Sequence, residues 1–144
     1  MSTLFATAAI TFAGLLPLPL PLPTASTESS AGTRAVAVSG VLDAADGRLK
    51  RGCKDYAYAY SVRTPTEDWT LDITMQDRNG KGVNAQSLIG PNDPGSGVLP
   101  FRLCRWGTTP GRFTLKGVLT SYDGYGGETS VTLTETFRLR RRNR

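Results

Sequence analysis

The two cysteines, Cys53 and Cys104, have the most defined chemistry of any residues in this chain. An even cysteine count in an exported chain predicts a disulfide, and a single pair allows only one intramolecular pairing. In each expected strand the cysteine alternates out of phase with the apolar residues, so its side chain should not point into the core. We therefore expect the bridge to join strand ends or loops at the rim of the domain. Free thiols or a redox-active pair are the alternatives, and a spacing far from Cys-x-x-Cys disfavours the redox pair.

The other candidates for chemistry are carboxylates, because the chain contains no histidine. This absence excludes Ser-His and Cys-His nucleophiles and imidazole zinc sites. Two carboxylate pairs, Asp68 with Asp72 and Asp123 with Glu128, have side chains of the type that acid and base catalysis uses. Solvated strand and loop charges are the simpler interpretation of both pairs, so we expect no catalytic residue.

The first residues of the loop that begins at Asp77, from Asp77 to Gly80, resemble the start of a calcium-binding loop. It lacks the further carboxylates of an EF-hand loop, so we expect a hairpin turn in which Asn79-Gly80 makes the tight reversal. No glycine-rich phosphate motif follows a strand and opens a helix. The sequence therefore predicts no metal, no cofactor and no nucleotide.

Three aromatic residues, Trp106, Tyr122 and Tyr125, fall in expected loops and not on core parity. Exposed flat rings can stack on sugars or anchor a protein partner, so these three are candidate binding residues. In the simpler interpretation Trp106 covers the disulfide and the two tyrosines close one end of the domain.

Basic residues outnumber acidic ones by 17 to 12, a formal net charge of +5. Charges between residues 34 and 137 nearly cancel, so the excess lies at the C-terminus. The basic tail, residues 140–144, contains Arg140, Arg141, Arg142 and Arg144. Such a cluster can bind anionic cell-wall polymers, lipid headgroups or nucleic acid. The alternative is a solubilising end without a partner.

The first residues of the chain have the composition of a secretory signal. The apolar run from Leu4 to Leu16 is shorter than the roughly 20 residues that span a bilayer, and its Met1-Ser-Thr start carries no basic residue. We expect a signal peptide and leader over residues 1–31, a sandwich domain over 34–139 and the tail over 140–144. An uncleaved anchor or an unstructured leader is the alternative.

We expect β-strands to position the candidate residues, because no segment after residue 34 has a helical period of useful length. Apolar and polar side chains alternate instead, as they do at Tyr56, Tyr58 and Tyr60, where we expect core rings with hydroxyls that reach the rim. The expected strands are 35–42, 53–62, 69–75, 83–89, 98–104, 112–119 and 129–139.

Several details of strand pairing follow from the same pattern. The second and third strands should pair as an antiparallel hairpin with a loop of medium length. The fourth is weaker and more polar and should lie at an edge, and Pro100 predicts an edge or a bulge for the fifth. Glu135 shares the parity of apolar neighbours, so we expect a bulge near Thr134 to rotate it outward. A rim position within reach of an arginine is the alternative for Glu135.

About seven short strands separated by regular turn signals predict an all-β fold, an antiparallel β-sandwich. The segment from Pro110 to Leu115 looks like the Gly-x-aromatic-Thr-aliphatic start of a penultimate strand, and Trp69 lies on the third strand. Through these residues the chain resembles the immunoglobulin-like and fibronectin-type-III-like modules of secreted bacterial proteins. The resemblance implies an immunoglobulin-like sandwich. It departs from antibody-type domains in its bridge, since Cys104 ends the fifth strand and antibody bridges join the second and sixth.

These features predict a secreted, extracellular module that binds a ligand or associates with the cell envelope and is not an enzyme. The expected partner is an anionic cell-envelope polymer, a glycan or another extracellular protein. We expect no transmembrane span in the mature chain. The alternative is a small secreted enzyme or inhibitor that uses loop carboxylates.

Overall fold

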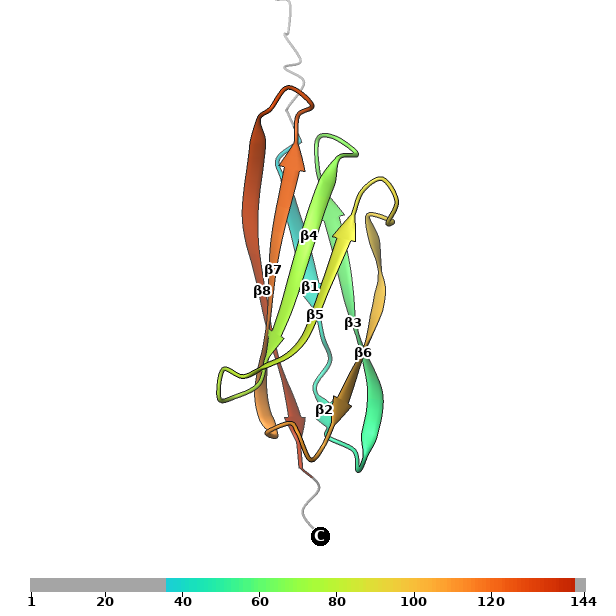
Figure 1. Cartoon of the computed structure of the whole chain (residues 1–144), viewed down its shortest axis with the longest axis vertical. Helices are drawn as coiled ribbons and strands as arrows, with labels where there is room; N and C mark the ends of the chain where they lie inside the picture. Colours follow the sequence, from blue (N-terminus) through green and yellow to red (C-terminus); the bar gives the residue numbers. More distant parts are fainter. Residues whose placement is uncertain (1–35, 142–144) are drawn as a thin grey trace, which may run out of the picture. The chain divides into compact units, whose positions relative to one another are not determined.

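Alternating apolar and polar side chains form β-strands along the described part of the chain, residues 36–141, in this computed structural model (Figure 1). The strands are β1 (Ser39–Asp43), β2 (Gly47–Arg48), β3 (Cys53–Arg63), β4 (Trp69–Gln76), β5 (Gly82–Ile89), β6 (Ser96–Cys104), β7 (Gly111–Tyr122) and β8 (Glu128–Arg140). No helical segment among these residues has the length and apolar character that crossing a membrane requires. The expected signal peptide and leader (1–31), together with Arg142 and Arg144, lie outside the described residues.

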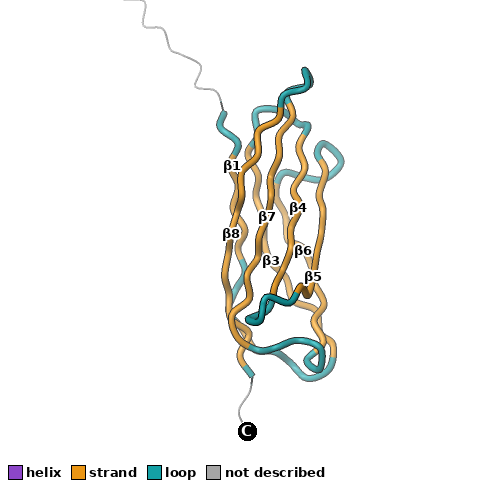
Figure 2. Tube along the Cα trace, turned by 60° about the vertical axis from the view of Figure 1, so that its left-hand side comes forward, coloured by secondary structure: helices purple, strands orange, loops and turns teal. Residues whose placement is uncertain are grey.

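The strands form two sheets that pack face to face (Figure 2). One sheet has the order β1-β3-β6, and the other has the order β2-β8-β7-β4-β5. All pairings are antiparallel except that of the short strand β2 with β8, which is parallel. The prediction of an all-β antiparallel β-sandwich is therefore confirmed. Strand β2 is an addition that the alternation pattern did not indicate.

The core lies between the inner faces of the two sheets. Phe101 of β6 meets Phe137 of β8 edge-on with ring centroids 6.1 Å apart, and Phe137 in turn stacks on Phe113 of β7 at 5.3 Å. The inward tyrosines of β3 bury their rings and keep their hydroxyls bonded at the edge of the core. Tyr58 donates to Gln86 Oε1 at 2.9 Å, and Tyr60 donates to the Pro94 carbonyl at 2.8 Å. The prediction that the tyrosines of this strand are core rings with hydroxyls at the rim is therefore confirmed for Tyr58 and Tyr60.

The predicted hairpin between the second and third strands is wrong. Strand β3 pairs with β1 and β6, whereas β4 pairs with β7 and β5 in the other sheet. The connecting residues cross between the sheets, so the apolar faces of β3 and β4 oppose each other across the core. Thr66 holds this crossing in place because its hydroxyl donates to the Tyr122 carbonyl at the end of β7.

The predicted edge strands and the Gly80 turn are confirmed, whereas the predicted bulge near Thr134 is wrong. Strands β5 and β6 both lie at sheet edges, and Gly80 has a φ of 76° in the turn between β4 and β5, as expected. The bulge expected near Thr134 is absent, since the β7–β8 register runs without a shift from Gly111↔Leu139 to Tyr122↔Glu128. Glu135 consequently keeps the core parity and is half-buried opposite Leu115.

Candidate functional site at the basic end of the sandwich

Antiparallel strands place alternate turns at opposite ends of the sandwich. Strands β3 and β7 begin where β4, β6 and β8 end (Figure 1). The turns at that end also contact each other, because Lys81 Nζ in the β4–β5 turn donates to the Gly107 carbonyl in the β6–β7 loop at 3.4 Å. The backbone N–H of Leu49 donates to the Arg140 carbonyl at 3.0 Å, which brings the β2–β3 loop to the end of β8.

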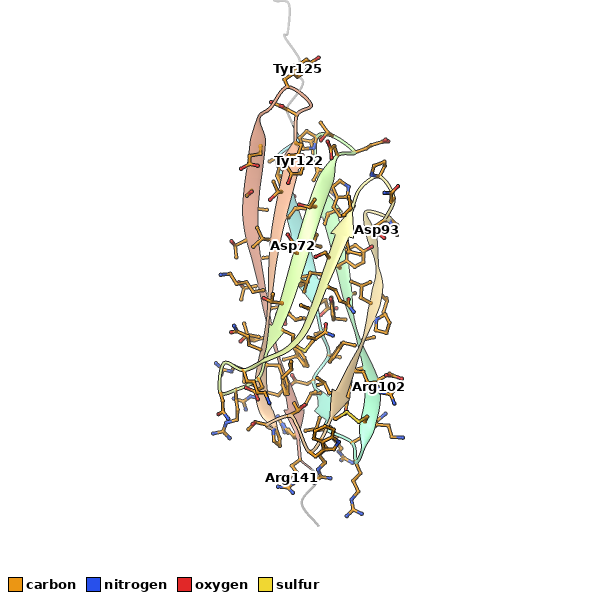
Figure 3. All side chains as sticks on the ribbon, viewed as in Figure 1. Asp72, Asp93, Arg102, Tyr122, Tyr125 and Arg141 are labelled. Carbon is orange, nitrogen blue, oxygen red and sulfur yellow. A yellow bond between two sulfur atoms is a disulfide. The ribbon has the colours of Figure 1, made fainter. Side chains whose placement is uncertain are left out.

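This arrangement separates the charges of the chain. At the end just described, which we call the basic end, the acidic residues are Asp46, Asp55 and Asp77, and the cationic residues are Arg48, Lys50, Arg51, Lys54, Arg78, Lys81, Arg102, Arg105, Arg112, Arg138, Arg140 and Arg141. At the opposite end, the acidic end, Arg63 accompanies Glu67, Asp68, Asp93, Asp123 and Glu128. Figure 3 places Arg102 and Arg141 toward the first end and Asp93 and Tyr125 toward the second.

The disulfide lies at the basic end and organises it. Cys53 and Cys104 are bonded partners directly opposite each other in the β3–β6 ladder, with Cα atoms 3.9 Å apart, so the predicted pairing at the strand ends is confirmed. The Arg105 N–H donates to the Gly52 carbonyl at 3.0 Å just beyond the bridge. This bond marks the cysteines as a non-hydrogen-bonded pair, in which opposing side chains approach most closely.

A shallow hollow of about 400 Å³ opens beside the disulfide, lined by Arg51, Gly52, Arg105, Trp106 and Arg141. The bridge connects its two walls, because Arg51 precedes Cys53 by two residues, and Arg105 and Trp106 follow Cys104 directly.

The hollow combines an open aromatic surface with three arginines. Trp106 is 85% exposed, so it does not fold over the disulfide as the simpler interpretation had it. Among residues 36–141, none of those that line the hollow is acidic. The ion pair formed among residues 36–141 is Arg102 with Asp55, at 3.5 Å between side chains that both face solvent. The guanidinium groups of the hollow are therefore available to an external anion.

The other two candidate aromatics lie at the acidic end, so the structure does not unite the predicted aromatic group. Tyr125 is 97% exposed, and Tyr122 borders a hollow of about 150 Å³ together with Asp123 and Glu128. The Asp123 carboxylate accepts hydrogen bonds from the Tyr125 and Gly127 N–H groups at 2.8 and 2.9 Å. These bonds lower the pKa of Asp123 and give the carboxylate a role in shaping the turn.

Asp77 has a structural role of the same kind. Its side chain is buried, and its oxygens accept hydrogen bonds from the N–H groups of Asn79, Lys81 and Thr109. Burial by itself would raise the pKa of Asp77, but these hydrogen bonds outweigh it, so the net pKa is lowered. Its oxygens therefore hold the β4–β5 turn closed and join that turn to Thr109 of the β6–β7 loop.

The two carboxylate pairs considered for catalysis are placed differently. In an extended chain the Cα atoms of Asp68 and Asp72 lie about 13 Å apart, whereas Asp123 and Glu128 line the same hollow at the acidic end. The Asp123 carboxylate is engaged there by the N–H groups of its own turn. The Asp72 carboxylate accepts a hydrogen bond from the Ser87 hydroxyl. Within residues 36–141 no three His, Cys, Asp or Glu side chains gather closely enough to hold a metal ion.

Comparison with known proteins assigns no function to this chain. Neither a protein-family model nor a curated protein sequence matches the chain. A β-glucuronidase from Parabacteroides merdae is similar over 74% of this chain, at 14% identity and a TM-score of 0.49, and the chain spans 13% of that enzyme. The CARDB domain of a Pyrococcus furiosus protein, solved in complex with di-metal ions, is similar over 74% of this chain and 96% of its own length, at 12% identity and a TM-score of 0.41. At this level of similarity, neither the enzyme's activity nor the domain's metal ions can be assigned to this chain.

Two cationic residues of the hollow, Arg51 and Arg105, were not among the sequence-derived candidates. The signal for them was present in the chain, since both stand within two residues of a cysteine. A disulfide between strand ends necessarily brings such flanking residues together. Arg140 and Arg141, predicted as part of a tail, instead belong to the end of β8 and to the rim of the same basic end.

Proposed function

We propose that this chain is a secreted, non-enzymatic binding module that attaches to an anionic polymer of the cell envelope through its basic end. The observation that carries the proposal is the separation of charge by the fold. A body that is nearly neutral in sum presents a strongly cationic end, centred on a hollow that Arg51, Arg105 and Arg141 line. Concentrated charge of one sign attracts polyanions and speeds their encounter.

The proposed framework is an immunoglobulin-like module. The order β1-β3-β6 against β2-β8-β7-β4-β5 corresponds to strands A-B-E against A′-G-F-C-C′ of that architecture. Phe113 is fully buried after Gly111 at the start of the penultimate strand, and Trp69 is buried on β4, the C-strand position. The bridge differs from that of antibody domains, because Cys53 and Cys104 join neighbouring strands of one sheet.

Export and the absence of catalysis are supported indirectly. A disulfide is typical of oxidising compartments, and the apolar run that begins at Leu4 has the composition of a signal peptide. The loop carboxylates Asp77 and Asp123 accept hydrogen bonds from turn N–H groups, a structural role that favours the binding module over the enzyme or inhibitor alternative.

The proposal is tested by binding of the exported protein to polyacrylate and to polyphosphate at rising salt. Binding should fall steeply as salt rises, because exposed charges are screened over about 8 Å at physiological ionic strength. Arg105→Glu should weaken binding about fivefold or more, which corresponds to about 1 kcal/mol.

Arg63→Glu is the matched control, since it makes the same change in net charge at the acidic end. It should leave the affinity within about twofold of the parent value. Equal losses from the two substitutions would mean that total charge governs binding and that the basic end has no special part in it. Failure of the parent protein to bind either polyanion at low salt would refute the function itself.

A further inference from the structure

The basic end contains a feature that attraction to a polyanion does not require, a flat aromatic ring held open to solvent. Trp106 is 85% exposed, whereas the other tryptophan, Trp69, is 4% exposed in the core. The indole of Trp106 stands in a turn closed by the Gly107 N–H, which donates to the Cys104 carbonyl at 3.0 Å. The turn begins at Cys104, so the disulfide anchors the segment that presents the ring.

The surroundings of the ring are polar and cationic. Arg51, Arg105 and Arg141 line the same hollow from three segments of the chain, and Gly52 contributes only backbone to its wall. Guanidinium groups bind carboxylate and phosphate through two parallel N–H donors, a geometry that a single point charge cannot reproduce. An aromatic face offers a complementary apolar surface to a flat or ring-shaped group.

We infer that this hollow binds a single sugar ring carrying an anionic group, with the ring on the Trp106 indole and the anionic group on the arginines. The inference rests on the proposed function and narrows it from polyanions in general to acidic polysaccharides. Carboxylate and phosphate fit the guanidinium geometry equally, so both sugar acids and sugar phosphates belong to this ligand class.

Size and shape favour a sugar over a single-stranded nucleic acid. Nucleic-acid binding of that kind uses successive aromatic platforms along a basic groove that follows several nucleotides. Here one indole stands in one hollow of about 400 Å³, and the other exposed loop aromatic, Tyr125, lies at the acidic end.

The test compares ligands that separate rings from charge, at matched concentrations of anionic groups and one fixed salt. Polygalacturonate carries carboxylates on sugar rings, polyacrylate carries them without rings, and dextran carries rings without charge. For phosphate groups, phosphorylated mannan carries them on sugar rings and polyphosphate carries them without rings. Oligo(dT) is included to represent single-stranded nucleic acid. We expect the charged polysaccharides to bind more tightly than the ringless polymers, and dextran to bind least.

Trp106→Ala decides the role of the ring. It should weaken binding of polygalacturonate or phosphorylated mannan about fivefold or more, as loss of an aromatic anchor does, and leave polyacrylate binding unchanged. Tyr125→Ala, which removes an equally exposed ring at the acidic end, is the matched control and should change neither affinity. Because both side chains face solvent, unchanged urea midpoints should accompany both variants.

Tryptophan fluorescence gives a second readout on the intact protein. A sugar on Trp106 should shield it from acrylamide quenching, while the buried Trp69 stays unquenched with or without ligand.

The outcomes separate the two proposals. If Trp106→Ala weakens polyacrylate and polygalacturonate alike, or neither, the sugar site is refuted and the polyanion function stands. If oligo(dT) binds more tightly than the charged polysaccharides in a Trp106-dependent way, the ligand class is wrong. If no polyanion binds the parent protein, both proposals fail together.

Discussion

Opening the Cys53–Cys104 disulfide is the perturbation whose effect on stability can be calculated most directly. The bridge closes a loop with a sequence separation of 51 residues. In the chain-entropy model, releasing a loop of this length lowers the free energy of unfolding by about 4 kcal/mol, an upper value for real proteins. We expect a loss of about 2 to 4 kcal/mol when the bridge is reduced.

The structure explains why the loss should arise in the unfolded chain. The cysteines end a continuous β3–β6 ladder, and the Arg105 N–H to Gly52 carbonyl bond continues beyond them. Both side chains are half-buried at the rim, so replacing them with serine removes little core volume. The folded ladder should therefore persist without the bridge, and the m-value should rise because the unfolded chain expands and exposes more surface.

Urea unfolding followed by tryptophan fluorescence measures both quantities. Trp69 reports the transition because it passes from the core to solvent, whereas Trp106 is exposed throughout. Reduced parent protein and the Cys53→Ser/Cys104→Ser variant should agree, since each lacks the same constraint. A loss below about 1 kcal/mol with an unchanged m-value would show that the bridge does not restrict the unfolded chain, and the entropy argument would be wrong.

Two further predictions concern the core. Gly90→Ala should destabilise the protein by about 1 to 3 kcal/mol, because the added methyl would overlap the Trp69 indole, whereas Gly82→Ala, with open space around it, should be near neutral in the same urea assay. Burial raises the pKa of Tyr58 from 10.0 to about 12. Above pH 10 the unfolded chain loses this proton while the folded chain keeps it, so stability should fall by up to about 1.4 kcal/mol per pH unit until about pH 12. Tyr58→Phe should lack this component of the slope, and an identical slope in parent and variant would contradict the assignment.

Most strands could be predicted from the chain because their information is local. Alternation at period two places apolar residues on one face, as in Leu71, Ile73 and Met75 of β4, and the core uses that face. The Asn79-Gly80 turn likewise depends only on residues beside it. Strand β2 escaped the pattern because two residues are too few to show alternation, and its pairing partner lies at the far end of the chain.

The pairing of strands was harder to predict because it depends on distant parts of the chain. A loop between two amphipathic strands is compatible with a hairpin in one sheet and with a crossing between sheets. The pairing depends on which strands are available as neighbours. Strand β6 pairs with β3, and β7 pairs with β4, so β3 and β4 do not pair with each other. The bulge predicted near Glu135 is absent for a related reason. Glu135 alternates in phase with the apolar residues of β8, which predicts a charged side chain in the core. In the structure it pairs with Leu115 and is only half-buried, so no bulge is needed.

The basic end does not show in the net charge summed along the chain, because the fold groups charges by alternate turns. In an antiparallel sandwich each strand reverses direction, so the turns beside Arg51, Lys81 and Arg105 share one end with the last residues of β8, whereas those beside Glu67 and Asp123 share the other. Summed in this way, the sequence already indicates a cationic end and an acidic one. Arg140 and Arg141 then belong to the basic end, since Arg140 ends β8 and Arg141 lines the hollow. Arg141 lines a hollow whose other cations flank the cysteines, so the disulfide that closes the β3–β6 ladder also aligns residues proposed to bind.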